Sequence, residues 1–175
     1  MFEPDDLLLA LTGAQVQFVV IGGVAVGVHG FIRATKDLDI VPDPSPANLE
    51  RLARLLVEIK AQHVGLEDFS PEEFPYDPTN PVQLAEGANF RLETSLGPLD
   101  IMQWLEGIES DLAYSELAPR AIPVTFRDTQ VQVCALDHLR AMKRAAARPK
   151  DLEDLERLGE KPDTPAVASS DTPDG

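Results

Sequence analysis

The segment from residue 18 to residue 41, FVVIGGVAVGVHGFIRATKDLDIV, constrains the fold more than any other part of the chain. A β-branched apolar run, 19–21, stops at Gly22-Gly23, and small apolar residues follow. This pattern predicts a strand, a glycine turn and a short helix. Residues 36–41, KDLDIV, then predict a second strand. Strands and a helix in such close succession favour an α/β (α+β) fold.

The second strand carries two acidic residues. Asp37 and Asp39 are two positions apart, so we expect their side chains on one face while Leu38 and Ile40 point into the core. Neighbouring carboxylates repel each other, and a divalent cation is the commonest reason to place them together. Mg²⁺ prefers oxygen ligands and is usually held by one or two carboxylates plus substrate phosphates. The pair is therefore a candidate Mg²⁺ or Mn²⁺ site, and a solvated strand edge is the alternative.

The glycine pair supplies a second candidate site. Gly22 and Gly23 precede the predicted helix, let the backbone approach a bound group and leave N–H donors free. We therefore expect the turn to contact phosphate. Alone, a glycine pair is a weak signal, and an Asp-x-Asp triplet at a strand end is more often a solvated edge or a turn. In this order and at this spacing, the two together indicate phosphoryl or nucleotidyl transfer.

The glycine pair, thirteen intervening residues and the triplet Asp37-Leu38-Asp39 resemble the signature of the polymerase-β-like nucleotidyltransferase superfamily. The spelling Arg33-x-Thr35-x-Asp37-x-Asp39 is most similar to its abortive-infection (AbiEii-like) toxin branch, a group of minimal nucleotidyltransferases. The resemblance covers residues 16–158. It implies a small mixed β-sheet flanked by helices, with further helices at the C-terminus.

Asp100 stands within an otherwise apolar strand of a hairpin predicted over residues 89–102. A buried carboxylate is costly unless it is paired or bound to a metal. Taken alone, Asp100 is expected to pair with Arg91. Under the resemblance, it matches the third carboxylate of the family, which lies on a neighbouring strand, helps to bind the catalytic metal and activates the attacking hydroxyl.

The C-terminal helical segment is predicted to be divided into two helices by Pro149. Its residues Lys143, Arg148, Asp151 and Asp154 resemble the C-terminal motif of the same branch, in which a lysine and a basic-acidic cluster approach the triphosphate. Lysine is a compact point charge suited to phosphate. Asp151 and Asp154 are one helical turn apart, so they can orient Arg148 or Lys143. A simply solvated basic face is the alternative.

The chemistry that the resemblance implies is transfer of a nucleoside monophosphate from an NTP to a hydroxyl, with release of pyrophosphate. Asp37 and Asp39 would hold two metal ions about 3.5–4 Å apart, and Asp100 would hold the ion nearest the acceptor. The residues expected to bind the nucleotide are Gly22, Gly23, Arg33, Thr35, Lys143, Arg148 and Asp151.

The expected acceptor is tRNA or a protein, and a toxin of this branch would have a cognate antitoxin. Many relatives carry Gly-Ser, whose hydroxyl reaches a phosphate, whereas position 23 is Gly here, so weaker triphosphate binding is expected. Two alternatives stay open. One is a catalytically inactive nucleotide-binding or partner-binding module, and the other is a binding protein with a simple metal site.

Composition limits the remaining possibilities. The chain has 175 residues, of which 43% are hydrophobic, so we expect one domain over residues 1–158. The single cysteine, Cys134, excludes an internal disulfide. A net charge of −15 argues against non-specific binding to duplex nucleic acid. With no signal-peptide pattern and no membrane-length apolar run, we expect a cytoplasmic location and no membrane partner.

The rest of the chain predicts ordinary elements. We expect helices over residues 4–11 and 46–62, a helix or helical turn over 104–117, and two strands within 121–135. We also expect a long Pro-rich loop, functional or disordered, over 67–86, and a disordered acidic tail over 159–175. Trp104 is expected in the core. Cys134 and the three histidines are expected to be structural, because none has metal-ligand spacing with a partner.

Overall fold

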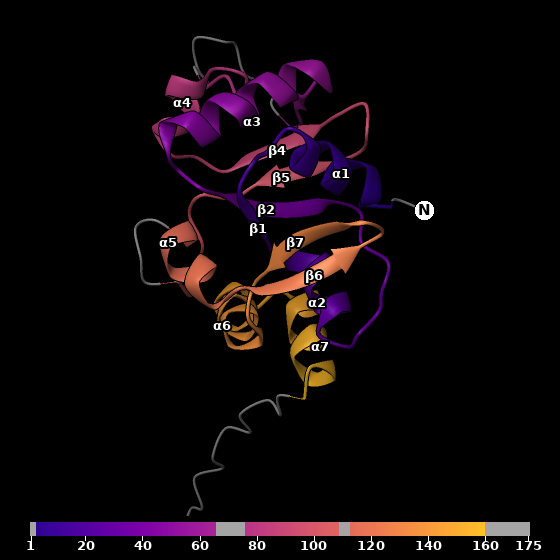
Figure 1. The fold of residues 1–175 in the computed structure, drawn as a ribbon. Helices are drawn as coiled ribbons and strands as arrows, with labels where there is room; N and C mark the ends of the chain where they lie inside the picture. The colour runs from indigo at the N-terminus through magenta and orange to yellow at the C-terminus, as the bar shows by residue number, and fades with distance from the viewer. Residues whose placement is uncertain (1–2, 66–75, 109–112, 160–175) are drawn as a thin grey trace, which may run out of the picture.

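A computed structural model of the chain describes residues 3–65, 76–108 and 113–159. There, seven strands form one mixed sheet in the order β3-β4-β5-β2-β1-β7-β6, with helices around it (Figure 1). The strands are β1 (Phe18–Val20), β2 (Leu38–Pro42), β3 (Gln62–His63), β4 (Phe90–Glu93), β5 (Leu99–Ile101), β6 (Ile122–Phe126) and β7 (Thr129–Val133). The helices are α1 (Asp5–Gly13), α2 (Gly22–Val28), α3 (Pro46–Glu58), α4 (Pro81–Ala85), α5 (Ala113–Leu117), α6 (Leu136–Ala146) and α7 (Pro149–Arg157). This architecture confirms the predicted α/β class.

The two strands of the segment 18–41 lie in the middle of the sheet. Strand β2 pairs antiparallel with β1 on one side and parallel with β5 on the other. In the β2–β5 register, Asp39 lies directly beside Asp100. Leu38 and Ile40 are fully buried, as the alternation of side chains on a strand requires. The fold therefore places two of the predicted site acids on adjacent central strands.

Helices cover the two ends of the molecule (Figure 1). Helix α3 begins at Pro46 and buries Leu49, Leu52 and Leu56, whose spacing of three and four residues makes one apolar stripe. At the other end, α6 packs on α7, and α2 contacts α6. Pro149 occupies the first turn of α7 and divides it from α6, as predicted. This packing brings the C-terminal basic segment to the glycine turn.

Two predicted boundaries in the first half of the chain are wrong. Helix α3 ends at Glu58, four residues early, because the backbone turns at Lys60, whose φ is +55°. The next residues, Gln62–His63, join β4 as an edge strand. The predicted loop over residues 67–86 contains the short helix α4, and residues 66–75 lie outside the described part of the chain.

The predicted helix or helical turn over residues 104–117 is confirmed only at its end. Residues 104–108 form turns and not a helix, residues 109–112 lie outside the described part of the chain, and α5 covers Ala113–Leu117. Gly107 explains the interruption, since its φ is +81° and an added Cβ would lie 2.5 Å from the carbonyl oxygen of Ala141 in α6. Trp104, expected in the core, is 50% exposed.

The predicted hairpin over residues 89–102 and the two predicted strands within 121–135 are present. Strands β4 and β5 pair antiparallel, and so do β6 and β7. Apart from Gly159, the predicted tail lies outside the described residues. Within the described ranges, none of the helices has the length and apolar character needed to cross a bilayer.

Candidate active site

The glycine turn is fitted against the acidic strand. Gly22 has a φ of +63°, and a Cβ added there would lie 1.9 Å from Oδ2 of Asp39. Glycine is therefore required for both the backbone conformation and the close approach. The N–H of Gly23 donates a hydrogen bond to Asp39. The expectation that the turn leaves its N–H groups free for phosphate is consequently wrong for Gly23.

Three carboxylates act on one another at the neighbouring ends of β2 and β5. Burial raises the pKa of Asp39 to about 6, with further contributions from the charges of Asp37 and Asp100. Burial, followed by the charge of Asp37, also raises the pKa of Asp100. An opposite charge would lower these pKa values and relieve the repulsion. The structure thus brings the three predicted catalytic acids together.

The pairing expected for Asp100 on structural grounds is present as well. Arg91 lies opposite Asp100 in the β4–β5 register, and its Nε is 3.6 Å from Oδ2 of Asp100. The Arg91 side chain is mostly exposed, so solvent weakens this ion pair. Despite it, the pKa of Asp100 stays above its ordinary value. The arginine therefore compensates the acidic cluster only in part.

The three acids have oxygen ligands suited to a metal ion, but their side chains are not positioned to bind one ion together in this structure. Carboxylate oxygens are the ligands that Mg²⁺ prefers. The raised pKa of Asp39 marks a place where positive charge is favourable. Among the described residues, however, no three His, Cys, Asp or Glu side chains are grouped closely enough to hold an ion together. The role of Asp37, Asp39 and Asp100 as metal ligands stays a prediction.

Gly23 faces the opposite side of the turn from Gly22. A Cβ on Gly23 would lie 2.5 Å from Oγ1 of Thr35 and 3.4 Å from Nη2 of Arg33. The Thr35 hydroxyl therefore occupies the space that a serine at position 23 would need, and it donates to Asp37 (3.1 Å to the carbonyl oxygen, 3.3 Å to Oδ1). Gly23, Arg33 and Thr35 line a separate cavity from the one that holds Asp39. They do not line the cavity that the other predicted nucleotide-binding residues share.

The C-terminal residues form a buried ion-pair network, which we call the Lys143 network. Lys143 Nζ lies 2.7 Å from Asp151 Oδ1 and 2.9 Å from Asp154 Oδ2. Arg33 donates to both oxygens of Asp154, at 2.9 and 3.0 Å. Arg148 Nε lies 2.7 Å from Asp151 Oδ2. Three cations and two carboxylates thus connect the loop before β2 to α6 and α7.

The electrostatics of this network are opposite to those of the acidic strands. Asp151 and Asp154 are each only 1% exposed. Burial alone would raise their pKa values, but hydrogen bonds and charges from Lys143 with Arg148 or Arg33 outweigh it and lower both. The predicted orientation of Lys143 and Arg148 by Asp151 is present. Asp154 instead orients Lys143 and Arg33.

A cavity of about 360 Å³ lies between the acidic strand and the network. Five of the predicted site residues line it: Gly22, Asp39, Lys143, Arg148 and Asp151. Lys143 is close enough to Asp39 to lower its pKa slightly. Carboxylates and cations at two walls of one cavity are suited to a ligand that carries both phosphate and bound metal.

Other residues of this cavity were not predicted. Asn89, Trp104 and Glu106 line it from the segments that flank β4 and β5. Trp104 was assigned to the core because its neighbours fit a helical spacing. Gly107, three residues later, is the sequence signal that argues against that helix.

Cys134 and His29 are structural, as expected. Burial raises the pKa of the Cys134 thiol to about 12, so it is not a nucleophile at neutral pH. The Nε2 atom of His29 lies 2.8 Å from the Cys134 carbonyl oxygen and ties α2 to the end of β7.

Comparison of the sequence with known proteins identifies no family for this chain. No protein-family model matches the chain, and no curated protein matches it significantly. Among solved structures, the chain is similar to a Thermotoga maritima protein described as a putative nucleotidyltransferase. The two share 16% identical residues with a TM-score of 0.48, over 91% of this chain and 93% of that one. Such a distant likeness decides neither the activity nor the AbiEii-like branch, so function has to be argued from the site.

Proposed function

We propose that this protein is a metal-dependent nucleotidyltransferase that moves a nucleoside monophosphate from an NTP to a hydroxyl group. The observation that supports it is the acidic cluster at Gly22, where Asp39 has a pKa of about 6 in a cavity that also contains Lys143 and Arg148. A protein gains nothing in stability from such a cluster, since burial and repulsion disfavour three charged carboxylates. A bound cation with a triphosphate would offset the repulsion, so a role in binding them explains why the three carboxylates lie near one another.

Each group has a role in this proposal. Asp37, Asp39 and Asp100 would hold Mg²⁺ or Mn²⁺, which when bound neutralises phosphate charge and makes the acceptor hydroxyl more acidic. Lys143 and Arg148 offset the charge of the triphosphate from the opposite wall. Gly22 lets the backbone approach Asp39 closely, because a side chain at this position would collide with the carboxylate. Arg33 supports the site indirectly by fixing Asp154, and Thr35 does so by fixing Asp37.

The acceptor and the biological role are proposed on the resemblance alone. The sequence favours tRNA or a protein as acceptor, and a toxin paired with an antitoxin as the role. The geometry of the site addresses neither point.

A second candidate is an inactive nucleotide-binding or partner-binding module on the same fold. Two observations favour it. Lys143 already has two carboxylate partners, Asp151 and Asp154. Because they compensate its positive charge, it attracts a phosphate less strongly. Within the described part of the chain, the three acids of the site are not grouped as metal ligands. An inactive module would bind an NTP without transferring its nucleotide.

Thermal unfolding with ligands tests the proposal. A ligand that binds only the folded state raises the unfolding midpoint. We expect an NTP with Mg²⁺ or Mn²⁺ to raise it, and the double substitution Asp37→Asn/Asp39→Asn to remove the metal-dependent part. The control is Asp137→Asn, an exposed acid outside the cavity. No shift with any NTP at millimolar concentration would contradict the proposal. A shift without release of pyrophosphate to any acceptor would favour the inactive module.

A further inference from the structure

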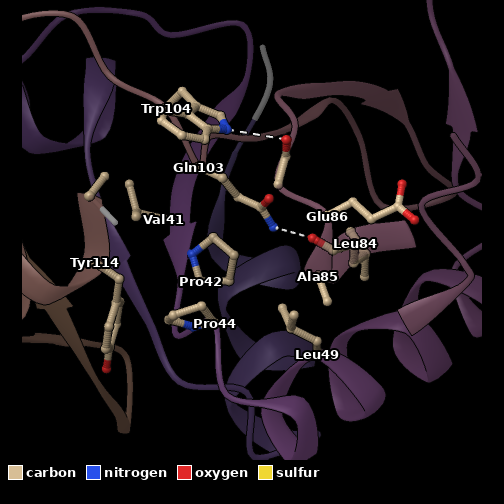
Figure 2. Close-up of a pocket in the computed structure, with 12 residues that line it drawn as sticks. Val41, Pro42, Pro44, Leu49, Leu84, Ala85, Glu86, Gln103, Trp104 and Tyr114 are labelled. Carbon is tan, nitrogen blue, oxygen red and sulfur yellow. Dashed lines mark hydrogen bonds between the residues drawn. The ribbon is translucent and has the colours of Figure 1, made fainter. Parts of the chain in front are cut away.

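A second cavity, of about 200 Å³, lies next to the candidate active site. Figure 2 shows its residues, which come from the end of β2 and the loop after it, from α3 and α4 with the residues after α4, from the segment after β5 and from the start of α5. Most are apolar, and the wall is formed chiefly by Val41, Pro42, Pro44, Leu49, Leu84 and Trp104. An apolar cavity of about 150 Å³ is enough to hold a benzene ring. The size and lining therefore suit one ring-shaped apolar group.

The second cavity adjoins the active-site cavity at strand β2 and Trp104. Asp39 lines one cavity and Val41 lines the other, and the two residues share a face of the strand about 7 Å apart. Trp104 lines both. A small molecule can therefore place a ring beside Val41 while its hydroxyl group lies at Asp39.

Trp104 presents an exposed but ordered aromatic ring to the cavity. Half of the residue is exposed, yet its position is fixed by three hydrogen bonds. Its ring N–H donates to the Gly87 carbonyl oxygen at 3.1 Å, and its backbone exchanges hydrogen bonds with the Asn89 side chain. An exposed aromatic ring that is already ordered loses little entropy when a ligand packs on it.

The charge of the second cavity argues for an uncharged ligand. Glu86 is the only charged residue among the described residues that line it, and none of them is Lys or Arg. The whole chain carries a net charge of −15. A nucleic acid depends on Lys and Arg contacts to its phosphates, and this surface offers none among the described residues.

We propose that this cavity is the acceptor pocket, and that the acceptor is an uncharged alcohol with a ring-sized apolar body, in place of the tRNA or protein that the resemblance alone favours. The inference rests on the proposed nucleotidyltransfer. In the reaction, the hydroxyl oxygen of the acceptor forms the bond to the α-phosphorus, and the bond from that phosphorus to the α–β bridging oxygen breaks. Pyrophosphate leaves with the electron pair, and the hydroxyl proton passes to a neighbouring carboxylate and then to solvent.

The single tryptophan of the chain makes the pocket directly observable. We would titrate the full-length protein with 2-phenylethanol and follow the one indole N–H resonance and the tryptophan fluorescence. Ala85→Phe fills the cavity from an exposed position on α4. Val82→Phe, on the same helix but 68% exposed and outside the lining, is the matched control. We expect saturable binding that Ala85→Phe weakens about tenfold or more and Val82→Phe leaves within about twofold.

Three outcomes would overturn the inference. The first is no response of Trp104 to 2-phenylethanol at about 10 mM, the affinity range expected for a ligand of this size. The second is tighter binding of the trinucleotide CCA at Trp104, with loss in Ala85→Phe, which would make a nucleic acid the acceptor. The third is ring binding without any shift of the unfolding midpoint by an NTP and Mg²⁺, which removes the proposed function and with it the acceptor role. Retention of the NTP shift in Ala85→Phe separates loss of the pocket from loss of the nucleotide site.

Discussion

The acidic cluster and the Lys143 network use the same residue type in opposite ways. In the cluster, Asp39 and Asp100 are near other carboxylates, and their pKa values are raised. In the network, Asp151 and Asp154 are also buried, yet their pKa values are lowered because cations touch every carboxylate oxygen named there. Deep burial of an acid is therefore not what marks a functional site in this protein.

The difference between the two groups of charges distinguishes carboxylates that are paired within the fold from carboxylates that are free to bind a ligand. The Lys143 network is complete without a ligand, since its carboxylates are paired with cations of the same chain. The acidic cluster is compensated only in part by the exposed Arg91, the more distant Lys143 and Arg148, because the pKa values of Asp39 and Asp100 stay raised. A group of charges that the fold leaves uncompensated is a candidate for binding an external ion.

The largest expected effect is the loss of the central cation of the network. Lys143→Met would leave Asp151 and Asp154 buried without their shared partner, which costs about 3–5 kcal/mol of unfolding free energy. Urea unfolding monitored by circular dichroism measures it. Arg120→Met, which removes an exposed pair with Asp137, is the control and should cost less than about 1 kcal/mol. Equal costs for the two variants would show that the network is not a stabilising unit.

Replacing Asp39, the central acid of the cluster, should increase the unfolding free energy, whereas replacing Lys143 should decrease it. The folded-state pKa of Asp39 is about 6 against an ordinary 3.8, so the folded state binds the proton more tightly than the unfolded state. The protonated Asp39 side chain therefore stabilises the fold at low pH, and this stabilisation is lost as the pH rises from about 4 to 6. At pH 7 the charged side chain lowers the unfolding free energy by about 1–3 kcal/mol. Asp39→Asn should be more stable than the wild type at pH 7, and the difference should shrink toward pH 4. A less stable variant at pH 7 would contradict the description of the cluster.

Acid titration of the network gives the matching prediction. The pKa values of Asp151 and Asp154 are lowered in the folded state, so their stabilising effect is present above the ordinary value and is lost as pH falls below it. Asp154→Asn should therefore lose most stability near pH 7, and its difference from the wild type should shrink as the pH falls below the ordinary aspartate value of 3.8. Parallel unfolding curves at several pH values measure this. A stability difference independent of pH would mean that Asp154 acts by shape and not by charge.

A smaller effect is expected at the glycine turn. Gly23→Ser should destabilise the protein by about 1–2 kcal/mol, because its Cβ would approach the Thr35 hydroxyl to 2.5 Å. Thr35→Ala should recover part of that loss in the double variant, since it frees the same space. A thermodynamic cycle of the single and double variants gives the coupling. Additive losses would show that the two residues do not compete for this space.

Much of this arrangement could be predicted from the sequence because it depends on local patterns. The alternation around Asp39 and the proline at the start of α7 identified these elements, although β2 begins at Leu38, so that Asp37 precedes the strand in which it was predicted. The resemblance placed Asp100 beside them, and the β2–β5 register agrees. These signals need only the residue order and the geometry of a strand or helix.

Other features depend on tertiary contacts that no local pattern records. The close packing of Gly107 on α6 breaks the helix that the spacing around Trp104 suggests. The pairing of Arg33 with Asp154 joins residues 121 positions apart, so each looked like a separate site residue. The second cavity forms only where the end of β2 meets α4 and Trp104. Sequence patterns therefore locate the acids, but they do not distinguish paired from unpaired ones.

A carboxyl-detected NMR titration of the aspartates, with and without Mg²⁺, tests the central claim most directly. Without the metal, Asp39 should titrate with a pKa of about 6, and Asp151 and Asp154 below their ordinary value. With saturating Mg²⁺, the pKa of Asp39 should fall below about 4, while the two network acids stay unchanged. An Asp39 pKa that Mg²⁺ does not move would contradict the claim that the acidic cluster is a cation site.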